Sequence, residues 1–550
     1  MKKYITIISM LAAGFVFADN ENYDGQDVSG KTFYGSYKNS SWIGATAVGT
    51  WFISGTFSSS DLTNANFTNA NLSKARIDGT VTDAIFTNAN LNECNISYVK
   101  GLTGSQLRSA ADITGIQFTQ TDLSNLNFSG LDFSGGQFYG TTVSNVDFTN
   151  AILDKVSFYG GVIGLTDKQL RSAKSIIGIS IFNFNATEYD LSGLNLSAGA
   201  IVNSTYINSN FAGTNLTSKT LGESNFSDSN FCGANLTNVY FRGSSLVNTN
   251  LTNANLTGVT FTTETDISGA TINGADLTST VENGFTFAHL ESTKSYADKN
   301  LSGVIFDYND IGGWDLSGLN LQNTSFFASK IAGTNFSNSD LRGADISVTK
   351  GTATYKNTIM SDGVIKNFSM ASADESLSIR KYTPAEGGEN ISAKIAEDAI
   401  ISGGAKLTLE QGAFFEVTNG KTLTVASDGL IQIDTDLSGS TIFNVNSSSG
   451  LVFEDGAILT VNIVDDIMTS DAYTIAVISF EDDSVISGLG DLIKDKTLLL
   501  TVNGEKFNGA WDYAVKGNEL SISINVPEPA TYAAIFGALA LAFAAYRRRK

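Results

Sequence analysis

Residues 191–261 read LSGLNLSAGAIVNSTYINSNFAGTNLTSKTLGESNFSDSNFCGANLTNVYFRGSSLVNTNLTNANLTGVTF. Every fifth residue of this stretch is large and apolar, and fifteen such positions follow one another without a break. They are Leu191, Leu196, Ile201, Tyr206, Phe211, Leu216, Leu221, Phe226, Phe231, Leu236, Phe241, Leu246, Leu251, Leu256 and Phe261. A helix repeats about every 3.6 residues and a strand about every 2, so this period of five indicates a repeat architecture.

The residues around each large position follow a pattern of their own. Asn usually comes directly before, and a small residue before that, as in Ala234-Asn235-Leu236. If the large side chain points to a common axis, the small one two residues earlier points the same way. The other three positions then face water, and their Ser, Thr, Asn and Gly suit tight turns. Stacked coils would pair their backbones about 4.8 Å apart and bury a continuous ladder of apolar side chains.

This A-N-L-x-x pattern resembles the pentapeptide-repeat family, whose members wind a right-handed quadrilateral β-helix with four pentapeptides per coil. The same period returns in three further blocks, from Phe52 to Ile96 with one slip, from Phe118 to Ile163, and from Leu301 to Ile346. The resemblance implies an all-β fold with a pentapeptide β-helix over residues 51–349. Residues 19–50 carry a poor repeat and are expected to cap its open end.

Three inserts with similar sequences interrupt the blocks, near residues 101–117, 164–180 and 284–300. Thr103 with Gln106, and Thr166 with Gln169, have capping-box spacing, which predicts a short helix in each of the first two. The third insert has His289 in place of the Gln and is a weaker case. Such inserts could carry binding or only cover a flank of the solenoid.

Residues 350–525 have a different character. Short alternating stretches such as Leu407-Thr408-Leu409 lie between Gly-, Ser- and Asp-bearing turns, which predicts an all-β region. It resembles the passenger-type β-solenoid of bacterial surface proteins, and its end, from Ala472 on, is expected to form a sandwich-like cap. Residues 352–526 hold 25 acidic against 11 basic side chains, whereas residues 191–261 hold two of each.

The N-terminus is typical of a secretory signal peptide over residues 1–18. Lys2 and Lys3 precede an apolar run from Ile5 to Phe17, and Ala18 offers a cleavage site for signal peptidase. The mature chain would then begin near Asp19, outside the cytoplasm.

The C-terminal segment, residues 526–550, contains three successive features. A motif comes first, formed by Val526, Pro527, Glu528 and Pro529. An apolar run over residues 530–546 follows and predicts a transmembrane helix. A basic cluster ends the chain, formed by Arg547, Arg548, Arg549 and Lys550. The order resembles the PEP-CTERM sorting signal of Gram-negative bacteria, which implies an exosortase that removes the tail. An ordinary C-terminal anchor that stays in the membrane is the alternative.

Few residues could carry chemistry. A single histidine, His289, gives zinc sites and His-based triads no support, and Cys94 and Cys232 lie too far apart along a solenoid to pair. We therefore predict no catalytic residue, cofactor or metal. The net charge of −21 argues against nucleic acid as a partner.

Paired carboxylates are the remaining candidates for catalysis or calcium binding. They are Asp434 with Asp436, Glu454 with Asp455, Asp465 with Asp466, and the run Glu481, Asp482 and Asp483. Their place in turns favours ordinary solvated groups, and none has the spacing of a defined calcium loop.

These features together favour a secreted, non-enzymatic structural or adhesive protein of a bacterial cell surface or exopolysaccharide. A tail-anchored surface protein with a glycan-binding or carbohydrate-active distal solenoid is the alternative. A third class, the DNA-mimicking pentapeptide protein that binds a topoisomerase through an acidic rod, conflicts with the neutral central block and the signal peptide.

Overall fold

The structure is a computed structural model, and its strands and helices fall into two compact units, Met1–Lys294 and Ser295–Lys550. The last pentapeptide block therefore belongs to the same unit as the distal strands. The structure describes residues 15–16, 19–418, 420–436, 440–464, 472–481, 485–488, 492, 497–507, 510–516 and 518–525.

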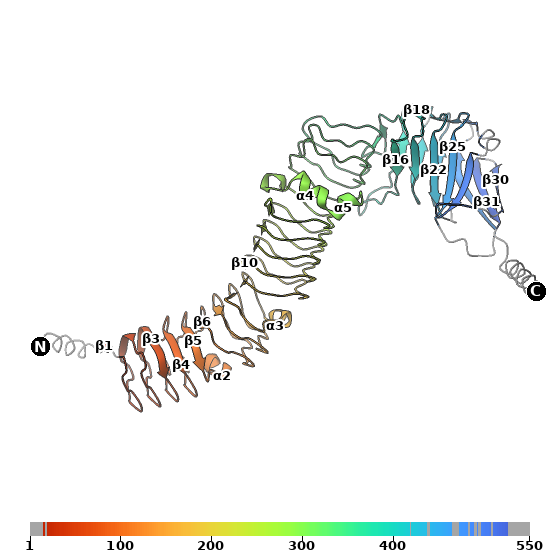
Figure 1. Ribbon diagram of the computed structural model, residues 1–550. Helices are drawn as coiled ribbons and strands as arrows, with labels where there is room; N and C mark the ends of the chain where they lie inside the picture. The colour runs from red at the N-terminus through yellow and green to blue at the C-terminus, as the bar shows by residue number, and fades with distance from the viewer. Residues whose placement is uncertain are drawn as a thin grey trace, which may run out of the picture. The chain divides into compact units, whose positions relative to one another are not determined.

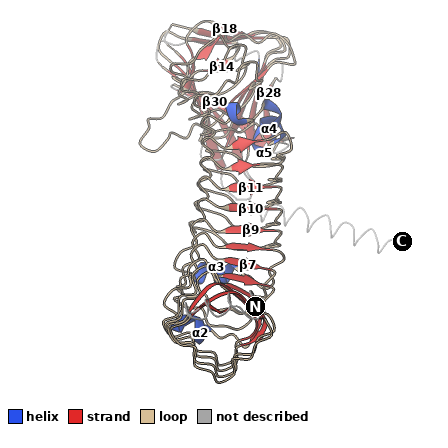
Figure 2. Ribbon diagram, turned by 90° about the vertical axis from the view of Figure 1, so that its left-hand side faces the viewer, coloured by secondary structure: helices blue, strands red, loops and turns tan. Residues whose placement is uncertain are grey.

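The first unit is built on one parallel sheet of 13 strands in chain order, several of which are stacked in Figure 2. These strands are β1 (Phe15–Val16), β2 (Thr32–Ser36), β3 (Trp51–Asp61), β4 (Arg76–Thr80), β5 (Asn95–Lys100), β6 (Gln117–Thr119), β7 (Gln137–Tyr139), β8 (Ser157–Tyr159), β9 (Ser180–Phe182), β10 (Ala200–Val202), β11 (Thr220–Gly222), β12 (Tyr240–Phe241) and β13 (Thr260–Phe261). Single parallel bridges, such as Asn210 with Asn230, join the other sides of successive coils.

Each side of a coil turns its corner in the same way. At Phe231 the carbonyl accepts a hydrogen bond from the Ala234 amide at 2.9 Å, and Gly233 has a φ of 64°. A type II turn needs a positive φ at this place, so Gly or Asn recurs two residues after the large apolar side chain. The Asn230 side chain accepts a bond from the Cys232 amide at 3.1 Å, which explains why Asn precedes that residue.

The predicted ladder fills the interior. All fifteen large residues from Leu191 to Phe261 are buried, with at most 4% of any side chain exposed. Rings stack from coil to coil, and the centroids of Phe211 and Phe231 lie 4.7 Å apart with the planes nearly parallel. The all-β pentapeptide β-helix expected from the sequence is confirmed. Cys94 occupies a buried small-residue position, where burial raises the pKa of its thiol to about 12.

The prediction that Ile163 points into the coil is wrong. Ile163 is 61% exposed, and Val162 is buried in its place. Gly160 and Gly161 are both left-handed, with φ of 70° and 83°, and they add one residue to this side of the coil. The extra residue moves Ile163 to an outward position, where it forms the bridge with Thr142.

Short helices stand where the inserts interrupt the repeat: α2 (Gly104–Ser109), α3 (Asp167–Ser172), the 3-10 helix η1 (Val281–Asn283), α4 (Phe287–Ser292) and α5 (Lys294–Ala297). Thr103 and Gln106 form a capping box on α2, and Thr166 and Gln169 form one on α3. Nε2 of the Gln106 side chain also donates to the Val81 and Ala84 carbonyls, at 2.8 and 2.9 Å. The capping side chain thus also ties its helix to the neighbouring coil.

The second unit begins with pentapeptide coils, in which Asn300 bridges Asn320 and Asn320 bridges Asp340. The antiparallel pair β14 (Thr358–Ile359) and β15 (Ile365–Lys366) follows. Bridges from Asp340 to Ile359 and from Val364 to Lys394 continue the backbone pairing into the distal strands. The pentapeptide coils and the distal strands therefore form one continuous stack in this unit.

The distal strands form three sheets, which we call the three-sheet domain (Figure 1). The first sheet has the order β16 (Ser376–Ile379), β19 (Lys406–Leu409), β22 (Leu430–Thr435), β25 (Ile458–Ile463), β28 (Leu498–Val502) and β29 (Glu505–Lys506). The second has the order β17 (Ala393–Ile395), β20 (Phe414–Val417), β23 (Ile442–Val445), β26 (Ala472–Phe480), β31 (Glu519–Asn525) and β30 (Ala510–Lys516). The third has the order β18 (Ala399–Ile401), β21 (Thr422–Val425), β24 (Gly450–Phe453) and β27 (Val485–Ser487).

The last strands depart from the prediction of a sandwich-like cap. β31 pairs antiparallel with β26, and β30 pairs antiparallel with β31, so both extend the second sheet. β29 likewise extends the first sheet by pairing antiparallel with β28. These hairpins cover edges that another coil would otherwise occupy, which protects unpaired backbone groups.

Candidate functional site

Lys219 is a buried charge in a position that otherwise holds a small residue. Its side chain is fully buried, and Nζ donates to the carbonyls of Ile179, Leu196 and Ala198 at 2.7, 3.0 and 2.8 Å. Burial lowers the pKa of Lys219 to about 7. Gly199 has a φ of 67°, and a Cβ there would lie 2.4 Å from the Ile179 oxygen that accepts from the lysine, so this place requires glycine. The ammonium group donates to three backbone carbonyls, so we assign it a structural role.

A second buried charge lies in the other unit, where the pentapeptide coils meet the three-sheet domain. Arg342 and Asp340 are both fully buried, and their closest nitrogen and oxygen are 2.6 Å apart. Arg342 also donates to the carbonyls of Arg380 and Ile391, at 2.6 and 3.1 Å. Gln322 donates to Asp340 at 2.8 Å. The pair joins two types of coil, and the hydrogen bonds account for both charged groups.

The carboxylates singled out from the sequence do not form a catalytic pair in the described residues. Asp434 accepts hydrogen bonds from Gln432 and Asn462, at 2.6 and 2.9 Å, and so belongs to a short polar ladder along the first sheet. Asp436 instead accepts from Gln411 and from the Ser440 amide, each at 3.1 Å.

The other predicted acidic groups give no site either. Glu454 and Asp455 are exposed in a turn, whereas Asp465, Asp466, Asp482 and Asp483 lie outside the described residues. Among the residues that the structure describes, no three His, Cys, Asp or Glu side chains gather where they could hold a metal ion.

His289 caps a helix. Its Nδ1 lies 3.0 Å from the Thr286 amide, and the Thr286 hydroxyl accepts from the His289 amide, which makes a capping box on α4. Burial lowers the pKa of the imidazole, although backbone hydrogen bonds with Thr262 and Thr265 act against this shift. An imidazole has one acceptor and one donor nitrogen, so it can replace the Gln of the first two inserts. The third insert, which was the weaker case in the sequence, therefore forms the same capping box as the first two.

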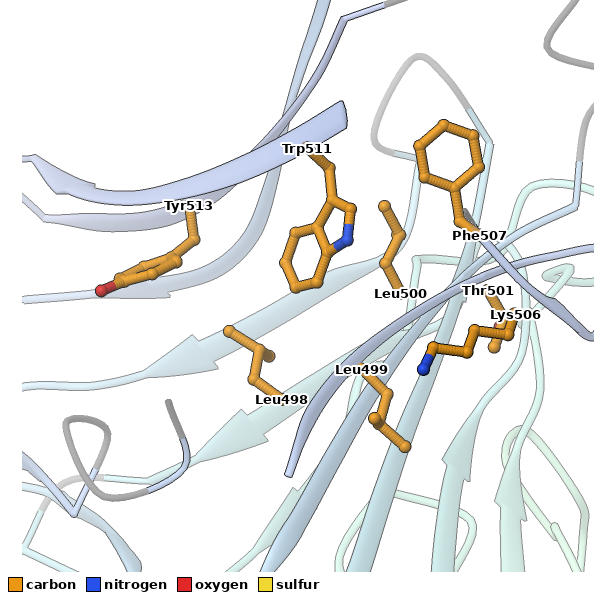
Figure 3. A pocket seen from close by; sticks show the side chains of 8 residues that line it. All are labelled: Leu498, Leu499, Leu500, Thr501, Lys506, Phe507, Trp511 and Tyr513. Carbon is orange, nitrogen blue, oxygen red and sulfur yellow. The ribbon is translucent and has the colours of Figure 1, made fainter. Parts of the chain in front are cut away.

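An apolar groove of about 360 Å³ lies at the end of the three-sheet domain. In Figure 3 the Trp511 ring lies between Tyr513 on one side and Leu500 and Phe507 on the other. The lining residues are Leu498, Leu499, Leu500, Thr501, Lys506, Phe507, Trp511 and Tyr513. Leu498 and Leu500 point into the core, and the hairpin strands β29 and β30 bring the aromatic side chains over them.

Chemically, this groove offers apolar and aromatic surface, the hydroxyls of Thr501 and Tyr513, and one cation, Lys506. The described residues that line it include no carboxylate, so it has the composition of a binding surface and lacks the acid pair of a glycosidase. The sequence interpretation missed it because it treated the distal end as a cap. The alternation of Trp511 and Tyr513 on one face of β30 is the signal that could have indicated it.

The predicted sorting and processing residues lie outside the described residues. They are Ala18, Val526, Pro527, Glu528, Pro529, Arg547, Arg548, Arg549 and Lys550. Within the described part of the chain, no helix is both long and apolar enough to cross a membrane. Both terminal signals stay predictions.

Comparison with known proteins bears on the repeat region. The family model named Pentapeptide repeats matches eight copies, in residues 52–81, 102–138, 111–150, 224–262 and 320–347. Among solved structures, QnrB1, a plasmid-mediated fluoroquinolone resistance protein, is 17% identical, with 33% of this chain and 86% of that chain covered and a TM-score of 0.18. HetL, a pentapeptide repeat protein involved in heterocyst differentiation regulation in the cyanobacterium Nostoc, is 13% identical, with 65% and 97% covered and a TM-score of 0.09. No curated protein matches the chain.

Proposed function

Because the chain carries pentapeptide repeats, we propose that it is a secreted, non-enzymatic structural or adhesive protein. It belongs to the cell surface or the exopolysaccharide of a Gram-negative-type bacterium and is sorted there through its C-terminal signal. Signal peptidase cuts after Ala18, and an exosortase recognises the motif at Val526–Pro529 and removes the basic tail.

The filled interior of the coils is the observation that carries this proposal. The residues of the Leu191–Phe261 ladder are buried, and so are small residues two positions before them, such as Ser209 and Thr214, so that only the other three positions of each pentapeptide reach solvent. Chemistry can then take place only on the outer faces, where Asn, Thr and Ser repeat at coil spacing. Many identical weak contacts along a rigid element suit attachment to a repetitive polymer.

Intact mass on protein recovered from the producing bacterium tests this function, with the membrane and extracellular fractions measured separately. We expect a released species that begins near Asp19 and ends near Pro529. A species that keeps Arg547–Lys550 in the membrane fraction would exclude the sorting route. Replacement of Pro527 and Pro529 by Ala should keep the tail on, whereas the same change at Pro384, outside the motif, should not.

A tail-anchored protein with a glycan-binding distal domain is the second candidate. The apolar groove around Trp511 favours this candidate, since aromatic rings can pack against the apolar faces of sugars. The absence of a carboxylate among the described lining residues argues for binding without hydrolysis. Retention of the tail in mature protein, together with loss of glycan binding in Trp511→Ala, would favour this candidate over the first.

A further inference from the structure

Three aromatic side chains form a row on the outer face of the first unit. The register pairs Tyr139 on β7 with Tyr159 on β8, and it continues to Phe182 on β9, because Phe158 pairs with Ile181. The two tyrosine rings are 5.0 Å apart between centroids. Tyr139 is 40% exposed, while Tyr159 and Phe182 are half-buried. The row lies on the stack of strands that Figure 2 shows edge to edge.

The row borders an open groove of about 570 Å³, which we call the aromatic groove of the first unit. Its lining residues are Gln137, Tyr139, Ser157, Tyr159, Gly160, Phe182 and Asn183. None of these is charged, and all the polar groups are amides or hydroxyls. The Tyr159 hydroxyl donates to Oε1 of Gln137 at 2.7 Å, which leaves the Gln137 amide nitrogen to donate elsewhere.

Gly160 holds the groove in this shape. A Cβ on Gly160 would lie 2.3 Å from Cε2 of Tyr139, so the tyrosine ring rests directly against bare backbone. The φ of 70° at Gly160 also favours glycine. Gly160, one of the two consecutive glycines that move Ile163 outward, therefore also lets the ring of Tyr139 lie against the sheet.

Aromatic rings that follow one another from coil to coil, with neutral amides beside them, match the groups of a sugar chain. The planes of the two tyrosine rings are inclined by 56° to each other, so each ring would contact a separate sugar residue. The C–H face of a pyranose packs on the negative face of an aromatic ring, and its hydroxyls pair with amide and hydroxyl groups. The ring spacing is close to the length of one sugar residue in an extended chain. Anionic polymers fit less well, because the lining residues offer no cation and the chain carries a net charge of −21.

A second protein is a poorer occupant. A stable protein interface needs about 800 Å² from each partner, and three partly buried rings supply only a fraction of that area. A linear polymer needs only a narrow strip along the coil axis, which is the direction in which the rings follow one another.

We propose that the aromatic groove of the first unit binds an uncharged polysaccharide through Tyr139, Tyr159 and Phe182. This inference deepens the proposed function and rests on it for the source of the polymer. The mass experiment and the binding experiment use different readouts, so either can fail while the other succeeds.

Native gels that contain laminarin, dextran or polygalacturonate test the proposal on the purified chain, with cellohexaose titrations in a calorimeter. We expect a neutral glucan to retard the protein and polygalacturonate to have no effect. Tyr139→Ala with Tyr159→Ala should weaken binding at least tenfold, whereas Tyr139→Phe, which keeps the ring, should stay within threefold of the wild type. Tyr240→Ala is the matched control, because Tyr240 faces outward on the same sheet, 37% exposed, without a ring contact among the described residues.

Gly160→Ala adds a test that leaves every ring in the chain. The added methyl group should displace the Tyr139 ring and weaken binding by a similar factor, and a circular dichroism melt shows whether the coil stays folded. Equal binding by the double tyrosine variant and the wild type would overturn the proposal. So would a wild type that no neutral glucan retards, or one that only polygalacturonate retards.

Discussion

The pentapeptide coils and the three-sheet domain both stack coil upon coil, but they differ in the bonds that hold successive coils together. In the coils, single backbone bridges between successive coils are accompanied by bonds between side chains, as Asn230 donates to Asn210 at a separation of 20 residues. In the three-sheet domain, strands of four to six residues carry the pairing through their backbones, as β19 does with β22. Leu407 pairs with Ile431, Ile431 with Leu459, and Leu459 with Leu498. The number of residues between paired positions grows from each pair to the next, so the coils become longer along the chain.

The difference shows what sets coil length. Each pentapeptide side ends in a turn with a positive φ at one place, where Gly and Asn are the commonest residues, so an insertion shifts the register, as it does at Gly161. Backbone-paired strands tolerate loops of any length between them, because the pairing does not involve the turn residues. The coils should therefore depend on particular polar side chains more than the strands of the three-sheet domain do, outside the polar ladder of Asp434 and Asn462.

The largest expected effect comes from the place where the two kinds of coil meet. Arg342→Ala leaves the Asp340 carboxylate buried without its cation, which should cost about 3–5 kcal/mol of local stability. Hydrogen exchange measured by mass spectrometry should show loss of protection on both sides of the junction. Lys330→Ala is the matched control, because its ion pair with Asp310 is exposed, and it should cost less than about 0.5 kcal/mol. Equal effects of the two substitutions would contradict the role of the buried pair.

The next effect concerns Lys219 and depends on pH. The pKa of this lysine falls from 10.5 to about 7 on folding, so between these values the unfolded chain binds more protons than the folded chain. Stability should therefore rise with pH across this window. From pH 7 to 10 the wild type should gain about 3 kcal/mol relative to Lys219→Met, which cannot titrate.

Denaturant unfolding followed by circular dichroism at several pH values measures this gain. Lys155→Met is the matched control, because Lys155 is exposed in the same unit and its substitution removes one amine without touching the coil interior. Parallel stability curves for the wild type and Lys219→Met would show that the buried amine stays fully charged over the whole window.

A smaller effect separates the two kinds of coil most directly. Asn230→Ala removes bonds to Cys232, Asn210 and Asn250, which should cost about 1–2 kcal/mol. Thr424→Ala, at an outward position of β21 in the three-sheet domain, should stay within about 0.5 kcal/mol. Hydrogen exchange in the affected coils gives both values. If Thr424 mattered as much as Asn230, the distinction between side-chain and backbone ladders would be lost.

The sequence was sufficient to predict the repeat, since a buried residue every fifth position leaves a periodic pattern. It was insufficient where the signal lies outside that pattern. Ile163 was predicted to point inward because the extra residue at the two consecutive glycines does not show in the five-residue pattern. The distal hairpins were predicted to form a separate cap because their pairing partners are far apart in the chain. The aromatic groove of the first unit was not predicted, because Tyr139 and Tyr159 occupy outward positions of the repeat, and outward side chains were interpreted only as keeping the solenoid soluble. Their shared context, Phe-Tyr-Gly in QFYG and SFYG, was the available signal.

The smallest expected effect has the opposite sign and tests how strictly the coil interior excludes water. Tyr206 occupies a ladder position, its ring stacks on Phe226 at 5.6 Å, and its buried hydroxyl has no hydrogen-bond partner among the described residues. Burial raises the pKa of this hydroxyl above its usual value. Tyr206→Phe keeps the ring and removes the unpaired group, so it should stabilise the coil by about 1 kcal/mol. Tyr37→Phe is the control, since the Tyr37 hydroxyl donates to the Tyr34 carbonyl at 3.0 Å and its loss should destabilise. Thermal melts of the two variants should move in opposite directions, and a lower midpoint for Tyr206→Phe would mean that the hydroxyl finds a partner inside the coil.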